Sequence, residues 1–159
     1  MSNDAESTEF FADPANSLGY LTRMVTRSFS RALEKRTLPH GISSGQWRFL
    51  RALWLEEGLS QRELSRRVGT QEPTTVTALK SLERSGLIRR ETSSEDRRRV
   101  HVYLTPDARK LRKKLAPFVV EVNALATRDL TPKQIKLLRQ LLMHVRQNLA
   151  DEDANGQVR

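Results

Sequence analysis

Apolar residues recur at three- and four-residue spacing along six stretches of the chain, which is the pattern of helices that bury one face. The first stretch predicts a helix over residues 17–37, which Pro39 and Gly41 end. A second helix follows Ser43, whose hydroxyl can cap the first turn while the side chain of Gln46 bonds back to it. The chain is therefore predicted to begin with two successive helices.

Two short helices joined by a tight turn come next. Ser60 and Glu63 have the spacing of a capping box, and Gly69 supplies the left-handed end of the helix that they open. Pro73 suits the first turn of the following helix, which is predicted over residues 73–85, because its missing N–H has no helical partner there. This order is typical of a helix-turn-helix.

After Gly86 the apolar period changes from helical to alternating, which predicts two strands over residues 87–92 and 100–104. The residues between them are polar and include three consecutive arginines, so the hairpin resembles a wing. Thr105-Pro106 and Thr131-Pro132 then open two further helices, predicted over residues 106–127 and 131–150.

The predicted fold class is mainly α with a small β-hairpin, a winged helix-turn-helix flanked by N- and C-terminal helices. The polar ends, residues 1–15 and 151–159, cannot bury enough surface to offset their ordering entropy and are predicted to be disordered tails. Residues 16–150 then form one domain, with a DNA-binding part at about 43–104.

Charge and composition favour a polyanionic partner. The chain has 28 Lys plus Arg against 19 Asp plus Glu, a net charge of +9. It contains no Cys, which excludes disulfides and thiolate metal sites. No apolar stretch approaches the roughly 18 residues that span a bilayer, and the N-terminus is polar and acidic, so a cytoplasmic protein without membrane contact is expected.

In a helix-turn-helix the second helix enters the major groove of DNA. Threonine hydroxyls can bond base edges or phosphates, threonine and alanine methyls can contact thymine, and a lysine can bind guanine or phosphate. A solvated face without a ligand is the alternative interpretation. The residues predicted to face the bases are Pro73, Thr74, Thr75, Thr77, Ala78, Lys80 and Ser81.

Residues outside this helix are predicted to complete the interface. Arg97, Arg98 and Arg99 of the wing can enter the narrow minor groove of A/T-rich DNA, and Asp96 can hold one of them by a charge-assisted pair. A solvated loop is the alternative for the arginines, and ordinary helix capping is the alternative for Ser60. The residues predicted to position the phosphates are Ser60, Gln61, Arg62 and Gln71, together with Asp96.

With these motifs the chain resembles the MarR family of bacterial transcription regulators, particularly its SlyA-like members. The resemblance spans about residues 17–150 and rests mainly on residues 64–69, 73–77, 82–88 and 96–99. It implies an obligate homodimer, held by the first and the last two helices, that binds a pseudo-palindromic operator. It also implies base contacts from Pro73, Thr74 and Thr77 and minor-groove contacts from Arg97 and Arg98.

One position departs from the SlyA-like pattern, because Thr77 stands where those relatives often carry Arg. The operator preference of those relatives is therefore not expected of this chain. The resemblance further implies a repressor of an adjacent operon that a small aromatic acid or phenol releases. The residues on the relevant helices that could bind this effector are Tyr20, Met24, Trp47 and Arg51. Ordinary core or surface positions are the alternative for all four.

Other classes of function fit the sequence less well. Residues 41–45 match the G-x-S-x-G motif of hydrolases, but no strand or parallel sheet surrounds them. His40, His101 and His144 lack the spacing of metal ligands, so no enzyme activity, cofactor or metal is expected. A non-specific RNA- or DNA-binding module, or a protein-interaction winged helix, remains the alternative.

Overall fold

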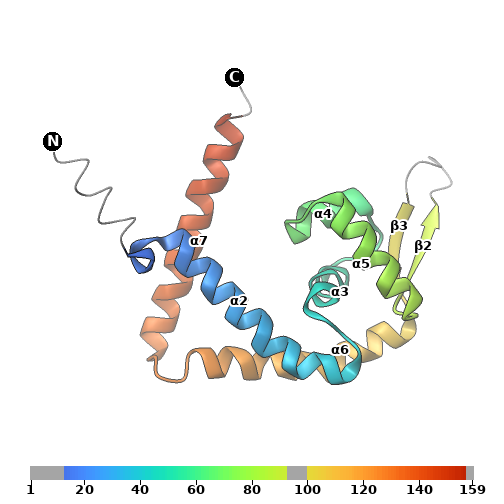
Figure 1. Cartoon of the computed structure of the whole chain (residues 1–159), viewed down its shortest axis with the longest axis horizontal. Coiled ribbons are helices and arrows are strands. Elements are labelled where there is room, and N and C mark those ends of the chain that lie inside the picture. The colour runs from blue at the N-terminus through green and yellow to red at the C-terminus, as the bar shows by residue number, and fades with distance from the viewer. Residues whose placement is uncertain (1–12, 93–99, 157–159) are drawn as a thin grey trace. The chain divides into compact units, whose positions relative to one another are not determined.

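The computed structural model describes residues 13–92 and 100–156, with side chains as far as residue 152. The chain divides into two compact units, residues 1–122 and 123–159, and each is described by itself. The elements of the first unit, in chain order, are η1 (Pro14–Asn16), α2 (Leu18–Thr37), η2 (Leu38–His40), α3 (Ser44–Leu55), β1 (Leu59–Ser60), α4 (Gln61–Val68), α5 (Glu72–Arg84), β2 (Ile88–Thr92), β3 (Val100–Leu104) and α6 (Pro106–Ala126), whose last turn crosses the boundary (Figure 1). The second unit contains α7 (Pro132–Gly156).

The predicted capping boxes start α3 and α4. Ser43 Oγ accepts from the Gln46 N–H at 3.3 Å, and the Gln46 side chain accepts from the Ser43 N–H at 3.0 Å. Ser60 and Glu63 make the same reciprocal pair. Gly69 ends α4 with φ 68°, the left-handed conformation that its sequence position predicted. The structure confirms these predicted helix ends. They could be predicted because the interactions that set them join residues a few positions apart.

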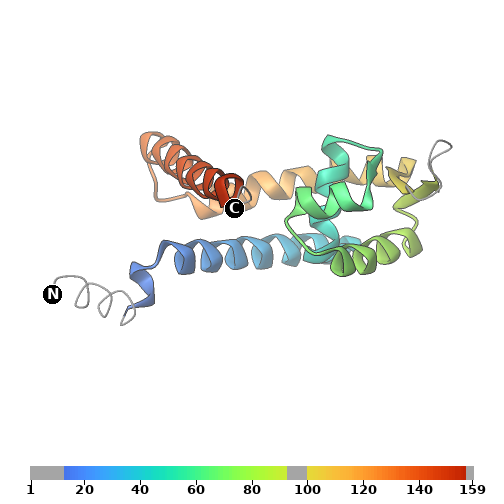
Figure 2. The same cartoon turned by 90° about the horizontal axis from the view of Figure 1, so that it is seen from above.

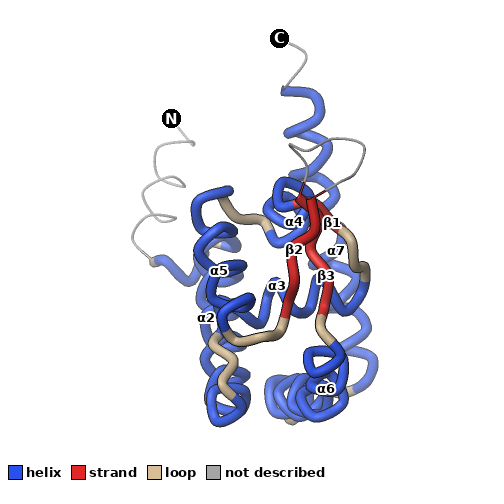
Figure 3. Tube along the Cα trace, turned by 90° about the vertical axis from the view of Figure 1, so that its right-hand side faces the viewer, coloured by secondary structure: helices blue, strands red, loops and turns tan. Residues whose placement is uncertain are grey.

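The sheet has three antiparallel strands in the order β1-β3-β2, where the sequence predicted only the hairpin (Figure 3). In the hairpin Ile88 pairs with Leu104 and Thr92 with Val100, and the buried side chains of β3 alternate as predicted. The additional strand β1 is two residues long and pairs Leu59 with Val102. So short a strand has no period of its own, which explains why the sequence pattern did not reveal it.

The core gathers around α3, which packs against α2, α4, α5 and β3 (Figure 2). Phe49 of α3 is fully buried beside Leu50. A helix with neighbours on several sides buries more than one stripe, so a single-face pattern underestimates its core. Leu79 and Leu82 of α5 are completely buried in the same cluster.

Two predicted boundaries differ from the structure. The C-terminal tail was predicted from residue 151, but α7 continues to Gly156, because no glycine or proline interrupts the chain between Pro132 and Gly156. Near the other end η1 crosses the predicted boundary at residue 15, with Asp13 accepting from the Ala15 N–H at 2.9 Å.

Two helices expose long apolar side chains. In the first half of α2 these are Leu18, Tyr20, Leu21, Met24 and Val25, and in α7 they are Leu137, Leu138, Leu141, Leu142, Met143 and Leu149. Neither helix, nor any other in the described part of the chain, has the length and apolar content required to cross a bilayer.

Candidate nucleic-acid interface

The helices α4 and α5 form the helix-turn-helix and are locked together by two buried hydroxyl groups. Ser65 of α4 and Thr75 of α5 lie with their side-chain oxygens 2.8 Å apart, and Thr75 Oγ1 also donates to the Gln71 carbonyl at 3.3 Å. Thr75 is fully buried, so the prediction that it faces outward is wrong. Its methyl and hydroxyl fit the helix–helix contact, which sequence period alone does not specify.

Pro73, Thr74, Thr77 and Lys80 are exposed along one side of α5, as predicted. Thr77 Oγ1 donates to the Pro73 carbonyl at 3.1 Å, so its hydroxyl oxygen remains able to accept a further hydrogen bond. An acceptor next to a methyl group suits the amino group of adenine or cytosine and the methyl group of thymine.

Ala78 and Ser81 are only partly exposed, which corrects their prediction as freely outward residues. Ala78 packs against the hydrophobic core. Ser81 Oγ accepts from Gln46 Nε2 at 3.0 Å, which ties α5 to the start of α3. Both side chains therefore mainly hold α5 in position, and they add little to its exposed face.

Arg84 belongs to the exposed side of α5 and was missed by the sequence prediction. It lies one turn after Lys80 and two turns after Thr77, a spacing that places all three on the same helix face. That spacing was available in the sequence. Lys80 and Arg84 form no ion pair with any described residue, so no carboxylate in this part of the chain competes with an anionic partner for them.

Glu83, the neighbour of Arg84, is engaged elsewhere. Its Oε2 accepts from Arg90 Nε at 3.0 Å and from Arg90 Nη2, which connects the end of α5 to β2. The hydrogen bonds from Arg90 hold the pKa of the Glu83 carboxyl below its usual range. The charges of Glu83 and Arg90 neutralise each other, and the pair holds the hairpin against the helix.

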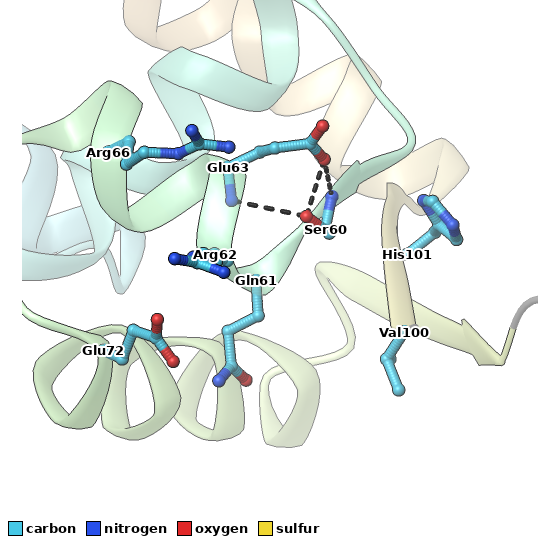
Figure 4. Close-up of a pocket in the computed structure, with 8 residues that line it drawn as sticks. All are labelled: Ser60, Gln61, Arg62, Glu63, Arg66, Glu72, Val100 and His101. Atoms are coloured by element: carbon cyan, nitrogen blue, oxygen red, sulfur yellow. Dashed lines mark hydrogen bonds between the residues drawn. The ribbon is translucent and has the colours of Figure 1, made fainter. Parts of the chain in front are cut away.

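A hollow of about 480 Å³ lies beside the start of α4 (Figure 4). It is lined by Ser60, Gln61, Arg62, Glu63, Arg66, Glu72, Val100 and His101. Three predicted phosphate-positioning residues, Ser60, Gln61 and Arg62, are thus brought together next to the first residue of β3. The fourth, Gln71, is exposed at the N-cap of α5 and makes no side-chain capping bond.

Within this hollow the acidic side chain is already satisfied. Glu63 Oε2 accepts from the Ser60 hydroxyl at 2.6 Å and from the Ser60 N–H at 2.7 Å, and these bonds lower the pKa of Glu63 (Figure 4). Ser60 is therefore a helix cap, the alternative that its sequence position allowed. His101 Nδ1 lies 2.7 Å from the Gly58 carbonyl and so donates its proton there. Among the described residues, the side chains of Gln61, Arg62 and Arg66 are then the donors of the hollow without a hydrogen-bond partner.

The predicted wing residues Asp96, Arg97, Arg98 and Arg99 lie outside the described residues. The strands on either side of them are paired from Ile88 to Thr92, so the hairpin itself is confirmed. The proposed contacts of its tip stay predictions.

The residues predicted to bind an effector are not joined by any hydrogen bond or ring contact in the described structure. Tyr20 and Met24 are exposed on α2, where the Arg23 guanidinium lies 5.6 Å from the centre of the Tyr20 ring. Arg51 is exposed on α3. Trp47 is buried in the core, edge to face with Trp54 at 5.4 Å, which fits the ordinary core alternative. Among the described residues no cluster of three metal-ligating side chains occurs.

Comparison with known proteins places this architecture in a family. The profile of the MarR family matches residues 42–100, which contain α3, α4, α5 and β2. The curated HTH-type transcriptional regulator TtmR of Methylorubrum extorquens is 36% identical over 88 residues, which is 55% of this chain and 45% of that protein. The aligned region thus spans less than half the length of that curated relative.

Solved structures share the fold over most of the chain. A MarR transcriptional regulator from Methanosarcina mazei is 26% identical with a TM-score of 0.80, and the match covers 84% of this chain and 96% of that one. The MepR protein of S. aureus, solved as a DNA complex, is 22% identical with a TM-score of 0.75 and covers 83% and 98%. The predicted fold class is confirmed, and the chain belongs to the MarR family of transcriptional regulators.

Proposed function

We propose that this protein is a homodimeric, sequence-specific DNA-binding regulator that inserts α5 into the major groove of an operator. The observation that carries the proposal is the exposed side of α5, where Thr77, Lys80 and Arg84 share one face and neither cation has an ion-pair partner among the described residues. The MepR relative, of the same fold, is described in complex with DNA, which supports this partner class.

The chemistry of the face divides between bases and phosphates. Thr74 and Thr77 offer hydroxyl and methyl groups to base edges, whereas Arg84 supplies the forked donor that can bind guanine with two hydrogen bonds. Arg62 and Gln61, in the hollow beside α4, suit the phosphate backbone that flanks the inserted helix. Arg97 and Arg98 of the wing would add contacts to the minor groove. The narrow minor groove of A/T-rich sequences attracts guanidinium groups.

The exposed apolar side chains of α2 and α7 support a second copy of the chain as partner, since a monomer in water rarely leaves such stripes uncovered. A two-fold dimer would present its two α5 helices about one DNA turn, roughly 34 Å, apart and would bind a pseudo-palindromic operator. By the family resemblance, the protein represses an adjacent operon, and a small aromatic acid or phenol releases it.

Competition binding on the protein's own promoter region tests the proposal. A labelled promoter duplex is bound at near-physiological salt, and unlabelled promoter, random duplex and RNA are added as competitors. We expect the promoter to compete at least about 1,000-fold better than random duplex, because base contacts add to the shared phosphate attraction. Equal competition by all three nucleic acids would instead favour a non-specific nucleic-acid-binding module, and no binding at all would favour a protein-interaction role.

A further inference from the structure

Between α3 and β1 the chain makes a turn, residues 56–58, that contacts strand β3. Gly58 donates its N–H to the Val102 carbonyl at 2.9 Å, and its own carbonyl accepts from His101 Nδ1 at 2.7 Å. Strand β1 follows the turn and runs beside β3, where Leu59 pairs with Val102 (Figure 3). The turn therefore extends the contact that so short a strand makes with β3.

Glu57, in the middle of this turn, joins β3 to the first turn of α6. Its Oε2 accepts from the Leu104 N–H at 3.0 Å. The same carboxylate accepts from Arg109 Nε at 2.9 Å and from Arg109 Nη2 at 2.7 Å, a forked geometry that is among the strongest ion-pair contacts. The hydrogen bonds from Arg109 hold the pKa of Glu57 below its usual range, so the carboxylate is charged at neutral pH. Glu57 thus connects the last residue of the hairpin to a helix.

The part of α6 that carries Arg109 is itself fixed to α3. Ala108 is fully buried, and its carbonyl accepts from Trp54 Nε1 at 3.0 Å. Arg112, one turn further along α6, donates from Nη1 to the Trp54 carbonyl at 3.1 Å. Through Glu57 and Arg109, strand β3 is therefore tied to a base that α3 and α6 build together.

The ring of Tyr103 keeps the turn close to both strands of the hairpin. Gly58 has a left-handed φ of 76°, and a Cβ at this position would lie 3.2 Å from the Tyr103 ring, so the close approach requires glycine. Arg89 is paired with Tyr103 across the hairpin, and its guanidinium lies 4.9 Å from the centre of the ring. The turn, β3 and β2 are thus in contact one after another, and a displacement of the turn would be transmitted to both strands.

We propose that Glu57 is a positioning residue for the wing and sets the direction in which the hairpin leaves the helix-turn-helix. This inference rests on the proposed DNA-binding function, in which the wing contacts the minor groove. A two-stranded ribbon is only marginally stable by itself, so contacts with the rest of the fold determine its direction. The contact of Glu57 with Arg109 and Leu104 is the one that fixes the end of β3.

The length of the strand amplifies a small movement at Leu104. Val100 lies at the other end of β3, roughly 13 Å along the strand. The Glu83–Arg90 pair holds β2 near its middle, so without the contact at Glu57 the hairpin can rotate about that pair. A rotation of about 10° would displace Val100 by roughly 2 Å, which is enough to break a hydrogen bond. Contacts made by the wing therefore depend on Glu57.

Hydrogen exchange in the full ¹⁵N-labelled chain, without DNA, tests the contact itself. Glu57→Gln keeps an acceptor for the Leu104 N–H but loses the charge that binds Arg109. We expect the amide protons of Gly58 and Leu104 to exchange at least about tenfold faster than in the wild type, because both depend on a fixed turn. The amide of Leu50, in the core helix α3, should exchange at an unchanged rate, which verifies that the fold is intact.

Glu56→Gln is the matched control. Glu56 lies in the same turn but pairs with Arg67 of α4 at 2.5 Å, so the substitution removes the same charge without touching β3. Exchange at Gly58 and Leu104 should stay within about twofold of the wild type. Arg109→Gln should accelerate the same amides as Glu57→Gln. The double variant should add nothing to the stronger single variant, since both act through one contact.

Two operator duplexes connect this contact to DNA binding. They share the half-sites found in the promoter region and differ only where the wings bind, in segments that are A/T-rich in one duplex and G/C-rich in the other. The wild type should prefer the A/T-rich duplex by at least about fivefold. In Glu57→Gln this preference should fall at least about threefold, whereas discrimination against a base change under α5 should stay within about twofold.

Several results would overturn the proposal. Unchanged exchange at Gly58 and Leu104 in Glu57→Gln is one, and equal acceleration by Glu56→Gln is another. A preference for A/T-rich flanks that survives Glu57→Gln would also reject it. A parallel loss of discrimination under α5 would do so too, because it indicates a general loss of structure. A wild type without any flank preference would instead contradict the wing contacts of the proposed function, and the exchange rates, measured without DNA, would still decide whether Glu57 fixes β3.

Discussion

Thr75 and Thr77 stand two positions apart in α5 and have opposite surroundings. A separation of two residues turns a helix by about 200°, so the two side chains lie on opposite sides. Thr75 is fully buried, with its oxygen 2.8 Å from that of Ser65, while Thr77 is exposed and bonds only to its own helix. The first threonine therefore positions the helix, and the second is available to a partner.

This contrast predicts different effects of the same substitution. Thr75→Val keeps the shape but removes the hydroxyl that bonds to Ser65 and to the Gln71 carbonyl. Ser65 keeps its bond to the Gln61 carbonyl, and the Gln71 carbonyl keeps its bond from the Thr75 N–H, so the free energy of unfolding should fall by about 1 kcal/mol. Thr77→Val should change it by less than about 0.5 kcal/mol. Urea unfolding followed by circular dichroism measures both. Equal losses of stability would show that the buried hydroxyl pair does not hold α4 and α5 together.

At the scale of elements, α5 is fixed to its neighbours at both ends. Ser65 holds its first turn, while Gln46 of α3 donates to Ser81 and Arg90 of β2 binds Glu83 in its last turn. Polar contacts thus define the rotation of the helix about its axis, which apolar packing alone specifies less sharply. The exposed face with Lys80 and Arg84 is presented as part of a rigid unit.

The two cations of this face, which have no ion-pair partner among the described residues, predict a measurable salt effect. Lys80→Gln with Arg84→Gln should weaken operator binding and reduce the slope of log K against log salt by up to about 2, because fewer counterions are released. Lys35→Gln is the control and should leave the slope unchanged, because Lys35 is exposed on α2 and has no ion-pair partner among the described residues. Fluorescence anisotropy at several salt concentrations measures the slopes, and identical slopes in all proteins would remove this face from the interface.

The Glu83–Arg90 pair predicts an effect of pH on stability. The folded pKa of Glu83 is lowered from 4.5, so the carboxylate stabilises the fold above that value, and this contribution is lost as the pH falls through the folded pKa. The stability difference between the wild type and Glu83→Gln should therefore be present near about pH 6 and shrink towards about pH 3.

Arg90→Gln serves as the matched variant, because it removes the partner that lowers the pKa of Glu83. Its stability difference from the wild type should shrink over the same acid range. Unfolding in urea at a series of pH values gives both curves. If the stability difference between the wild type and Glu83→Gln stays constant from neutral to acid pH, the Glu83–Arg90 ion pair adds no stability. Partly exposed ion pairs often behave in this way.

At the scale of the whole molecule, the exposed apolar residues of α2 and α7 are the feature that most requires a partner. In α7 the side chains of Leu138, Leu141, Leu142 and Leu149 are 44–60% exposed. They recur at helical spacing and form one stripe, which is the form of a helix that packs against another surface. A second copy of the chain would offer the same stripe in return.

A charge placed in that stripe should separate the copies. Leu141→Asp with Leu138→Asp buries two carboxylates in the proposed dimer contact, so we expect a species near the chain mass of 18.3 kDa in sedimentation, against twice that mass for the wild type. Gln140→Asp adds a charge on the opposite side of α7 and should remain dimeric. A monomeric wild type, or a dimer that survives the double substitution, would contradict this assembly.

Several parts of the fold and site followed from the sequence because their causes are local. Ser43 with Gln46, and Ser60 with Glu63, start helices through bonds between residues three apart, and Gly69 ends one through its own φ. The exposure of Pro73 and Thr77 followed from helical spacing alone. Arg84 could have been predicted in the same way, since it continues the face of Thr77.

Only the tertiary structure decided which polar residues of α5 are used in packing within the protein. Thr75 and Ser81 carry hydroxyl groups as Thr77 does, but Ser65 and Gln46 of other helices bond to them. The strand β1 likewise exists only because β3 lies beside it. Spacing along the chain assigns a residue to a side of its helix, whereas burial depends on which distant segment packs there, and that partner is absent from any short stretch of sequence.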